Sequence, residues 1–381
     1  MKTEKIKEKI FGSQLMNLVV TLFVLILAGS LLFAQDNKTE QSFPDVIMAG
    51  TQQREIYSKI VGQYYELYIN LPADYNNTTK SYPVIYLLDA QWDFALLNAI
   101  YGQQYFDGFI PEIVTVGITW GGKNPNADNL RARDFTPTSI KGPIPTGNAA
   151  NFLKFIKEEL IPFIEKNYRV TNDRTIMGSS LGGLFTLYAL FNETDLFNKY
   201  VLTSPALGWD NGSLYSYEKN FKQRESGPPI RLFMAIGGLE HQADFQKLAD
   251  HLKSMNYKNL EIGIKIIEGI GHSGGKADGY TRGLQFAFER PSLSLSSDIL
   301  DQYVGTYQPN DQVKIKVTKK DGHLEAEATG QGKVELLAES ESDFYAKGVF
   351  LNVHFKKDEN NKVTGIQLEQ YTGGAFIKKV D

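Results

Sequence analysis

The sequence contains no cysteine among its 381 residues. That absence excludes a disulfide framework, a thiol nucleophile and thiolate metal sites, and it leaves the redox compartment undetermined. Histidine is also scarce: the five histidines are scattered without the spacing of metal ligands, and no EF-hand-like acidic loop is present. We therefore expect no metal and no other cofactor.

The chain also lacks a marked excess of charge of either sign. Its formal net charge of −4 implies no strongly basic face, so nucleic acid is not expected as a partner. Apolar residues are plentiful, with 42% hydrophobic and 12% aromatic residues. This composition supports a large buried core, and the length leaves room for two or three domains. The sequence gives no indication of the oligomeric state.

The N-terminus predicts a targeting segment. The lysine-rich "MKTEKIKEKI" is followed by the apolar run "LMNLVVTLFVLILAGSLLFA", which ends in small residues. This pattern is typical of a secretory signal peptide over residues 1–35, cut near Ala34 or Gln35. The alternative is an uncleaved signal anchor, because the run is nearly long enough to span a bilayer. Either reading places the folded part outside the cytoplasm, secreted or periplasmic, with no stable membrane insertion after cleavage. No cysteine follows the run, which excludes a bacterial lipoprotein anchor.

Residues 36–292 alternate between β-rich runs and stretches with helical spacing. The β-rich runs are "YYELYINL", "YPVIYLLD", "EIVTVGIT", "RTIMG", "KYVLTS", "IRLFMAIG" and "EIGIKIIEG". Helical spacing is clearest over residues 151–168 and 240–255, where apolar residues recur at three- and four-residue steps. Such alternation predicts an α/β domain with a mostly parallel sheet covered by helices on both faces. Chemistry is then expected at the carboxyl ends of the strands.

The pattern changes over residues 298–381. Period-two alternation replaces helical spacing in "VKIKV", "HLEAEA", "VELLAE", "VFLNVHF" and "GIQLEQY", and "KKDGH", "TGQGK" and "DENNK" supply turns. We predict a small, all-antiparallel β domain here, with a barrel-like sheet.

Two segments match the nucleophile pattern G-x-S-x-G, at residues 178–182 and 271–275. A nucleophile elbow needs a strand, a tight turn and a helix, so that the serine stands at the helix N-terminus. The first match lies between the β-like "RTIM" and the apolar "LFTLYALF". The second is followed by "KADG", which is poor material for the first turns of a helix. This context favours Ser180 over Ser273.

The order of residues gives a second test. In α/β-hydrolases the triad runs serine, acid, histidine. Ser180 is followed by candidate acids and then by His272, whereas Ser273 is followed only by two histidines in the β domain. We therefore predict Ser180 as the nucleophile and His272 as the base that accepts its proton.

The triad acid is expected after the strand "IRLFMAIG", where the sequence offers Glu240 and Asp244. Glu240 is favoured because it lies at the strand-to-helix turn, whereas Asp244 lies one turn into the helix. An oxyanion hole needs two backbone N–H groups. We expect one from Leu181 and the other from the loop after "VIYLLDAQW", with Gln91 preferred over Ala90 and Trp92.

Residues 40–290 resemble the putative-esterase family of α/β-hydrolases. The family includes enterochelin and bacillibactin esterases, S-formylglutathione hydrolases, feruloyl and acetylxylan esterases, and mycolyltransferases. The stretches that carry the resemblance are "PVIYLLDAQWDF", "IVTVGITWGGKNPNADNLRARDFTPT", "NFLKFIKEELIPFIEKNYRV", "IMGSSLGGLFTLYALFNETDLFNKYVLTSPALGWDN" and "IGGLEHQ". The enterochelin-esterase-like branch is the most similar. One departure is Ala90, where the family usually carries glycine.

The resemblance implies a secreted serine carboxylic-ester hydrolase that acts through an acyl-enzyme on a small-molecule or carbohydrate ester. It implies that Trp92, Arg133, Asp134 and Trp209 contact the substrate; the alternative is an Arg–Asp pair that braces a loop and a tryptophan in the core. Lys123, Arg131 and Arg133 would suit a catecholate or another anion, although loop cations are usually just solvated.

Other functions stay open at this point. They are an acetyl or feruloyl esterase acting on polysaccharide, an acyltransferase on the same scaffold, and a non-catalytic binding protein. The β domain resembles the small domains that follow serine hydrolases in bacterial secreted proteins. It is expected to be structural, with carbohydrate or surface binding as the alternative.

Overall fold

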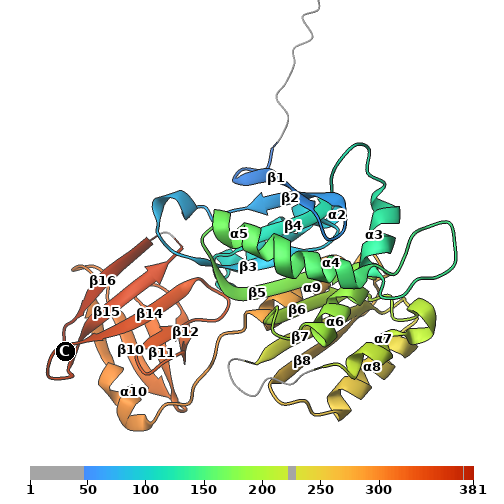
Figure 1. The fold of residues 1–381 in the computed structure, drawn as a ribbon. Helices are drawn as coiled ribbons and strands as arrows, with labels where there is room; N and C mark the ends of the chain where they lie inside the picture. Colours follow the sequence, from blue (N-terminus) through green and yellow to red (C-terminus); the bar gives the residue numbers. More distant parts are fainter. Residues whose placement is uncertain (1–46, 222–228, 372) are drawn as a thin grey trace, which may run out of the picture. The chain divides into compact units, whose positions relative to one another are not determined.

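The structure is a computed structural model that describes residues 47–221, 229–371 and 373–381. Residues 50–381 form one unit, which contains an eight-stranded sheet and a closed β-barrel (Figure 1). The expected signal peptide, residues 1–35, lies outside the described residues. Among those that are described, no helix has the length and apolar character needed to cross a membrane.

The large sheet is mixed, with the strand order β1-β2-β4-β3-β5-β6-β7-β8. Its strands are β1 (Thr51–Ser58), β2 (Gln63–Asn70), β3 (Tyr82–Leu87), β4 (Val114–Trp120), β5 (Val170–Ser179), β6 (Lys199–Thr203), β7 (Ile230–Gly237) and β8 (Leu260–Ile267). β2 pairs antiparallel with β1 and β4, and the remaining neighbours run parallel. The predicted α/β fold with a mostly parallel sheet is therefore confirmed.

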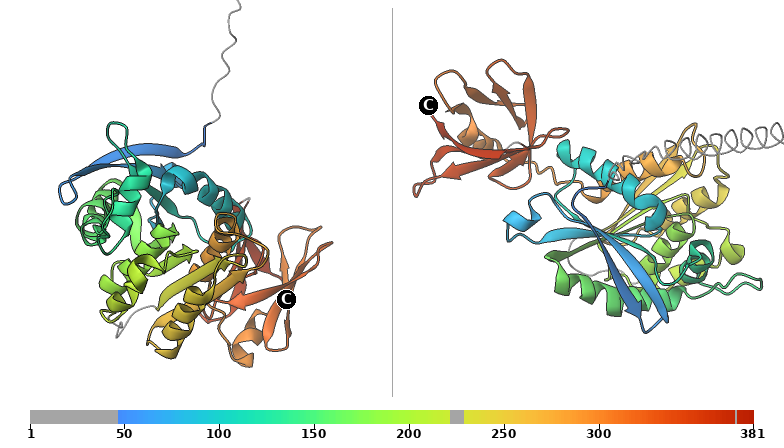
Figure 2. Two further views of the ribbon diagram at one scale, coloured as in Figure 1. Left: turned by 90° about the vertical axis from the view of Figure 1, so that its right-hand side faces the viewer. Right: turned by 90° about the horizontal axis from the view of Figure 1, so that it is seen from above.

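Helices connect the strands on both faces of the sheet (Figures 1 and 2). They are η1 (Tyr75–Asn77), α2 (Ala90–Phe106), α3 (Ala127–Phe135), α4 (Ala149–Phe155), η2 (Ile156–Leu160), α5 (Ile161–Asn167), α6 (Leu181–Asn192), η3 (Trp209–Gly212), α7 (Leu214–Glu218), α8 (Ala243–Ser254) and α9 (Gly275–Ala287). The helix predicted over residues 151–168 is present as α4, η2 and α5, and η2 is a π-helical turn. Pro162 lies just after η2 and has no N–H to donate, which accounts for the local change of hydrogen bonding.

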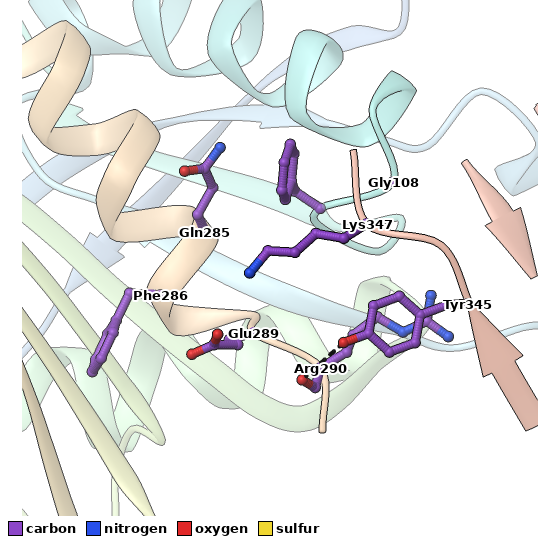
Figure 3. Close-up of a pocket in the computed structure, with 8 residues that line it drawn as sticks. Gly108, Gln285, Phe286, Glu289, Arg290, Tyr345 and Lys347 are labelled. Atoms are coloured by element: carbon purple, nitrogen blue, oxygen red, sulfur yellow. Dashed lines mark hydrogen bonds between the residues drawn. The ribbon is translucent and has the colours of Figure 1, made fainter. Parts of the chain in front are cut away.

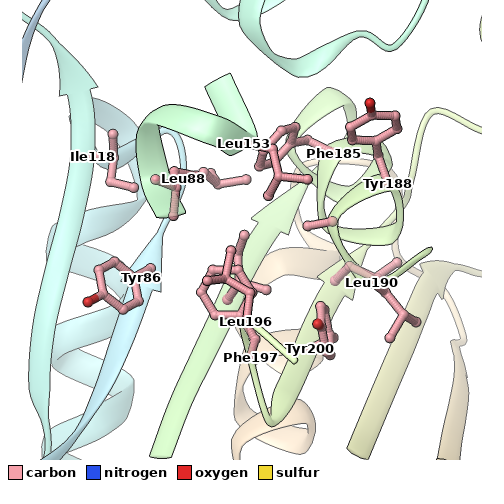
Figure 4. Packing of buried hydrophobic residues seen from close by; sticks show 14 of the residues in the cluster. Tyr86, Leu88, Ile118, Leu153, Phe185, Tyr188, Leu190, Leu196, Phe197 and Tyr200 are labelled. Atoms are coloured by element: carbon pink, nitrogen blue, oxygen red, sulfur yellow. The ribbon is translucent and has the colours of Figure 1, made fainter. Parts of the chain in front are cut away.

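Alternate residues of the central strands belong to two separate hydrophobic cores. Val84 and Tyr86 of β3 belong to the core that also contains residues of α4, α5, α6 and α8, whereas Ile85 and Leu87 belong to the core with residues of α2 and α9. Figure 4 shows part of the first core, where Tyr86 and Phe185 lie among buried aliphatic side chains. A sheet buried on both faces explains why these strands read as continuous apolar runs in the sequence.

The C-terminal part begins with α10 (Ser297–Tyr303) and forms a closed, all-antiparallel barrel. In spatial order its strands are β10 (Ile315–Lys320), β11 (His323–Ala328), β12 (Lys333–Ala338), β13 (Asp343–Tyr345), β14 (Leu351–Lys357), β15 (Val363–Gln370), β16 (Gly373–Lys379) and β9 (Gly305–Gln308). Tyr303 of α10 stacks on Phe355 within the barrel core, with ring centroids 4.1 Å apart. The predicted antiparallel β domain is confirmed, and its closure removes exposed sheet edges.

One local expectation is wrong. The composition of "GGKADG" predicts a segment unsuited to a helix, yet α9 begins at Gly275. Two glycines of this helix make a close approach to β6 possible. A Cβ at Gly279 would lie 2.4 Å from Cγ2 of Thr203, and one at Gly283 would lie 2.2 Å from Cγ1 of Val201. Tertiary packing therefore overrides the low helix propensity of glycine.

Candidate active site

Ser180 lies at a strained turn between β5 and α6. Its φ of 58° and ψ of −117° are rare for a residue with a side chain. The turn is tight, because a Cβ at Gly178 would lie 2.6 Å from the carbonyl carbon of Gly182. This is the backbone geometry of a nucleophile elbow, with the serine at the N-terminus of a buried helix.

Ser273 has a similar sequence context but a different backbone. It lies between β8 and α9, so strand, turn and helix surround both serines. Among the residues with a defined position, Ser180 has a positive φ and Ser273 does not. Ser273 is also exposed. Backbone strain at the serine therefore distinguishes the two motifs, whereas the presence of a following helix does not.

Glu240 and His272 lie together at the carboxyl ends of β7 and β8. Oε2 of Glu240 is 2.6 Å from Nδ1 of His272. Asp244, the alternative acid, lies exposed in the first turn of α8. The His272 side chain is 49% exposed, so the imidazole is accessible from solvent. The structure thus pairs the predicted base with the favoured acid.

The other carboxylate oxygen of Glu240 has two donors. Oε1 accepts from the Ser204 hydroxyl at 2.6 Å and from the Gly237 N–H at 2.9 Å. Burial acts to raise the pKa of the Glu240 carboxyl, but the hydrogen bonds from Ser204, His272 and Gly237 outweigh it and hold that pKa below its ordinary value of 4.5. The carboxylate is therefore charged at neutral pH, as orienting an imidazole requires.

Ser204 is not among the residues predicted from the sequence. It lies within "VLTSPALGWDN", part of a stretch that carries the family resemblance, but no motif assigns it a role. Its position directly after β6, a strand between β5 and β7, also points to the site.

Gln91 and Leu181 both lie in the first turn of a helix, Gln91 as the second residue of α2 and Leu181 as the first of α6. Gln91 is expected in a loop, but α2 already begins at Ala90, after Asp89 with a φ of 54°. The Trp92 N–H donates to the Asp89 carbonyl at 3.0 Å. The N–H groups of Gln91 and Leu181 belong to the first turn of their helices, where no carbonyl within the helix is available to accept. Such N–H groups suit a negatively charged oxygen.

Arg131 supports the turn that precedes Gln91. Its Nε and Nη2 donate to the two carboxylate oxygens of Asp89, at 2.9 and 2.7 Å. Burial raises the pKa of Asp89, and the bidentate Arg131 opposes that rise. The guanidinium also lies 5.5 Å from the ring centroid of Trp92, which is 50% exposed. Arg131 is therefore engaged with the protein, whereas the Trp92 ring is available to a ligand.

Asp134 does not line a pocket mouth, which corrects the expectation from the resemblance. It is 0% exposed and accepts from the Tyr65 hydroxyl and the Trp120 Nε1–H, each at 2.8 Å. Arg133 donates to both of its carboxylate oxygens. Tyr65 and Trp120 come from other segments of the chain, so no local pattern showed that the Arg–Asp pair is structural. Trp209 is half-buried, and its Nε1–H donates to Thr138 Oγ1 at 3.0 Å.

A buried charge pair joins α9, which follows His272, to α2, which contains Gln91. Lys276, in the first turn of α9, donates to Oδ1 of Asp93 at 2.8 Å. Tyr280 donates to the other oxygen of Asp93 at the same distance. Asp93 lies in the first turn of α2, and all three side chains are largely buried. The pair therefore links the segment carrying His272 to the segment carrying Gln91.

A pocket of about 240 Å³ lies away from these residues (Figure 3). The Lys347 side chain extends into it, and the Tyr345 hydroxyl donates to the Arg290 carbonyl beside it at 3.2 Å. None of the candidate catalytic residues lines it. In the part of the chain that the structure describes, no group of three or more His, Asp or Glu side chains is arranged to hold a metal ion.

Comparison with known families finds two matches. Residues 58–267 match the family described as "Putative esterase". Residues 289–376 match a family described as a domain of unknown function, DUF3471. The first match contains Ser180 and Glu240, and His272 lies five residues beyond its end.

Relatives and solved structures each cover about two thirds of the chain. Ferri-bacillibactin esterase BesA of Bacillus subtilis is 30% identical over 271 residues, which cover 65% of this chain and 93% of BesA. The crystal structure of the BES protein from Bacillus cereus aligns with a TM-score of 0.59 at 30% identity, over 65% of this chain and 97% of that one. An IroE-like serine hydrolase from Shewanella oneidensis aligns with a TM-score of 0.55 at 27% identity, over 66% and 85%.

Proposed function

Because the chain belongs to the "Putative esterase" family of α/β-hydrolases and is a carboxylic ester hydrolase, we propose that Ser180, His272 and Glu240 are its catalytic triad. The observation that carries this proposal is the 2.6 Å contact between Glu240 and His272. It joins the base to an ionised acid and leaves Nε2 of His272 to accept a proton from the serine.

The proposed reaction proceeds through an acyl-enzyme. Oγ of Ser180 attacks the ester carbonyl carbon while its proton passes to Nε2 of His272. The N–H groups of Leu181 and Gln91 hold the oxyanion, and each such donor contributes roughly 3 kcal/mol to transition-state stabilisation. The bond to the alcohol oxygen then breaks, and that oxygen takes the proton from His272. Water attacks the acyl-enzyme by the same steps, which releases the acid and returns the proton to Ser180.

For the substrate we propose a small-molecule siderophore ester. Support comes from BesA, which is named a ferri-bacillibactin esterase and resembles this chain over 93% of its own length. The half-exposed Trp92 is next to Gln91 in the sequence, so an aromatic group of the substrate would meet its ring beside the oxyanion. Acyl transfer to an alcohol and hydrolysis of polysaccharide esters are the competing outcomes that a substrate comparison separates.

Two serine variants test the nucleophile. With short p-nitrophenyl esters, Ser180→Ala should remove turnover and labelling by a fluorophosphonate probe. Ser273→Ala should keep most of both, because Ser273 lacks the elbow backbone. Loss of labelling in Ser273→Ala with labelling kept in Ser180→Ala would contradict the proposal.

The substrate class needs a parallel comparison. The purified protein should be assayed on enterobactin-like trilactones, feruloyl and acetyl xylan esters, and simple aryl esters, with and without an acceptor alcohol. The proposal expects the highest kcat/KM on the trilactones, with free acid as the product. Higher kcat/KM on xylan esters, or transfer to the alcohol as the main reaction, would refute the substrate proposal and leave the triad standing.

We also propose export through the N-terminal segment, residues 1–35. The support is the sequence pattern of a lysine-rich start, an apolar run and a small-residue end. N-terminal sequencing of the mature protein should begin near Gln35. A cytoplasmic protein that retains Met1 would refute export, and an exported protein that retains the run would indicate a signal anchor.

A further inference from the structure

The segment that follows β6 contains a strained, buried serine. Ser204 has a φ of 45° and is 3% exposed. Its N–H donates to the Ala235 carbonyl of β7 at 2.7 Å, which fixes the backbone. Its hydroxyl donates to Oε1 of Glu240 at 2.6 Å. A serine keeps such a sparsely populated backbone conformation only where several surrounding interactions hold it in place.

The two carboxylate oxygens of Glu240 have different hydrogen-bond partners. Oε1 accepts from Ser204 and Gly237, and Oε2 faces Nδ1 of His272. The terminal torsion of a glutamate is broad, so its carboxylate rotates easily unless both oxygens are engaged. Oε1 accepts one hydrogen bond from the Gly237 N–H and a second, from a different direction, from the Ser204 hydroxyl. Together they orient Oε2 toward the imidazole.

The same segment also holds the backbone of the nucleophile. The Ser180 N–H donates to the Thr203 carbonyl, and the Ala206 N–H donates to the Ser180 carbonyl, each at 3.0 Å. The approach is close, since a Cβ at Gly183 would lie 3.2 Å from Cα of Pro205. Residues 203–206 therefore contact the elbow through their backbone and the triad acid through a side chain.

We propose that Ser204 is a positioning residue for catalysis: its hydroxyl orients Glu240, and through Glu240 the base His272. This inference rests on the proposed triad. Ser204 acts on no substrate atom, so its removal should alter the catalytic rate and leave substrate binding unchanged.

Two variants separate the hydroxyl from the strained backbone. Ser204→Ala and Ser204→Gly both remove the hydrogen bond, but glycine adopts a φ of 45° without strain. Because the lost bond is to a charged group, both should lower kcat on p-nitrophenyl acetate roughly ten- to a hundredfold. KM should change less than about twofold. Thr175→Val is the matched control, since it removes a buried hydroxyl of β5 that has no hydrogen-bond partner among the described residues. It should keep the wild-type kcat.

A double-mutant cycle shows whether Ser204 acts through the acid. In a Glu240→Ala background, Ser204→Ala should cause no further fall in kcat, because the group it orients is gone. A fall equal to that in the wild-type background, or wild-type kcat in Ser204→Gly, would overturn the proposal. Ser180→Ala is assayed alongside. If it stays active, the proposed triad fails and the inference with it; if it is inactive while Ser204→Ala and Ser204→Gly keep the wild-type kcat, the inference alone fails.

Discussion

Oε2 of Glu240 lies 2.6 Å from Nδ1 of His272, although 32 positions separate the two residues in the sequence. They meet because they follow β7 and β8, which are parallel neighbours. Ser180 follows β5, separated from β7 by β6 alone. The strand order thus brings the three residues of the proposed triad to the carboxyl ends of neighbouring strands, where α/β folds bind their ligands.

The first prediction concerns the acid. Glu240→Gln keeps the shape of the side chain but removes the charge that selects the tautomer of His272 and stabilises its imidazolium. We expect kcat on p-nitrophenyl acetate to fall by about a thousandfold or more, with little change in KM. Asp244→Asn is the matched control, because Asp244 lies exposed in α8, and it should retain wild-type kcat. A large loss in Asp244→Asn with near-normal Glu240→Gln would reassign the acid.

The second prediction follows from the lowered pKa of Glu240. A carboxyl whose folded pKa is depressed stabilises the fold fully above its ordinary pKa, and that stability disappears as the pH falls through the folded pKa. Wild type should therefore be more stable than Glu240→Gln at neutral pH. The difference should shrink as the pH falls below the ordinary value of 4.5.

Urea unfolding at a series of pH values measures this difference. Thr175→Val, which changes no titrating group, should differ from wild type by the same amount at every pH. A gap between wild type and Glu240→Gln that widens toward acid would mean that the folded pKa of Glu240 is raised, contrary to the effect of its hydrogen bonds from Ser204, His272 and Gly237.

Much of the candidate site could be predicted from the sequence because the residues of the proposed triad follow chain order. Strand runs, the glycines around Ser180 and the serine–acid–histidine order are all local or sequential patterns. They were sufficient to pair Glu240 with His272. The antiparallel C-terminal sheet was also indicated by its regular alternation and turns, whereas its closure comes from the pairing of β9 with β16.

What the sequence did not show depends on contacts between distant segments. Asp134 is buried because Tyr65 and Trp120 donate to it, and neither is near it in the chain. Ser204 reaches Glu240 from a different strand. The helix α9 forms from a glycine-rich segment because it packs on β6, which propensity does not encode. These are tertiary effects, and a single sequence carries no direct record of them.

The third prediction concerns the buried pair between α2 and α9. Asp93→Ala leaves the Lys276 ammonium and the Tyr280 hydroxyl without their shared acceptor. Removing one partner of a buried pair costs about 3 kcal/mol or more of unfolding free energy. The exposed pair between Asp278 and Arg282 on the same helix gives the control, and Asp278→Ala should cost less than about 1 kcal/mol.

Denaturant unfolding of both variants measures the two costs. Equally small losses of unfolding free energy in Asp93→Ala and Asp278→Ala would show that Lys276 is solvated and that its pair with Asp93 does not stabilise the fold. A large loss in Asp93→Ala should be accompanied by a lower kcat, since the pair links the segments that carry His272 and Gln91.

The fourth prediction uses the glycines of α9. In an exposed helix, replacing glycine by alanine stabilises by about 1 kcal/mol. At Gly279 and Gly283 the same replacement should destabilise the protein, because the added Cβ would lie 2.4 Å from Thr203 and 2.2 Å from Val201, respectively. Overpacking of this kind costs about 1–3 kcal/mol. Gly102→Ala in α2 is the matched control, since nothing lies within 4 Å of its Cβ position, and it should be stabilising.

Thermal or urea unfolding of the three alanine variants decides between the two effects. If propensity governed α9, all three would gain stability, and close packing on β6 would not explain why a glycine-rich segment forms this helix. If packing governs α9, only Gly102→Ala should gain stability. Gly279→Ala should also lower kcat, because the Thr203 carbonyl accepts the hydrogen bond from the Ser180 N–H and a shift of β6 would move the proposed nucleophile. Gly283→Ala, one turn farther along α9, should destabilise the fold with a smaller effect on kcat.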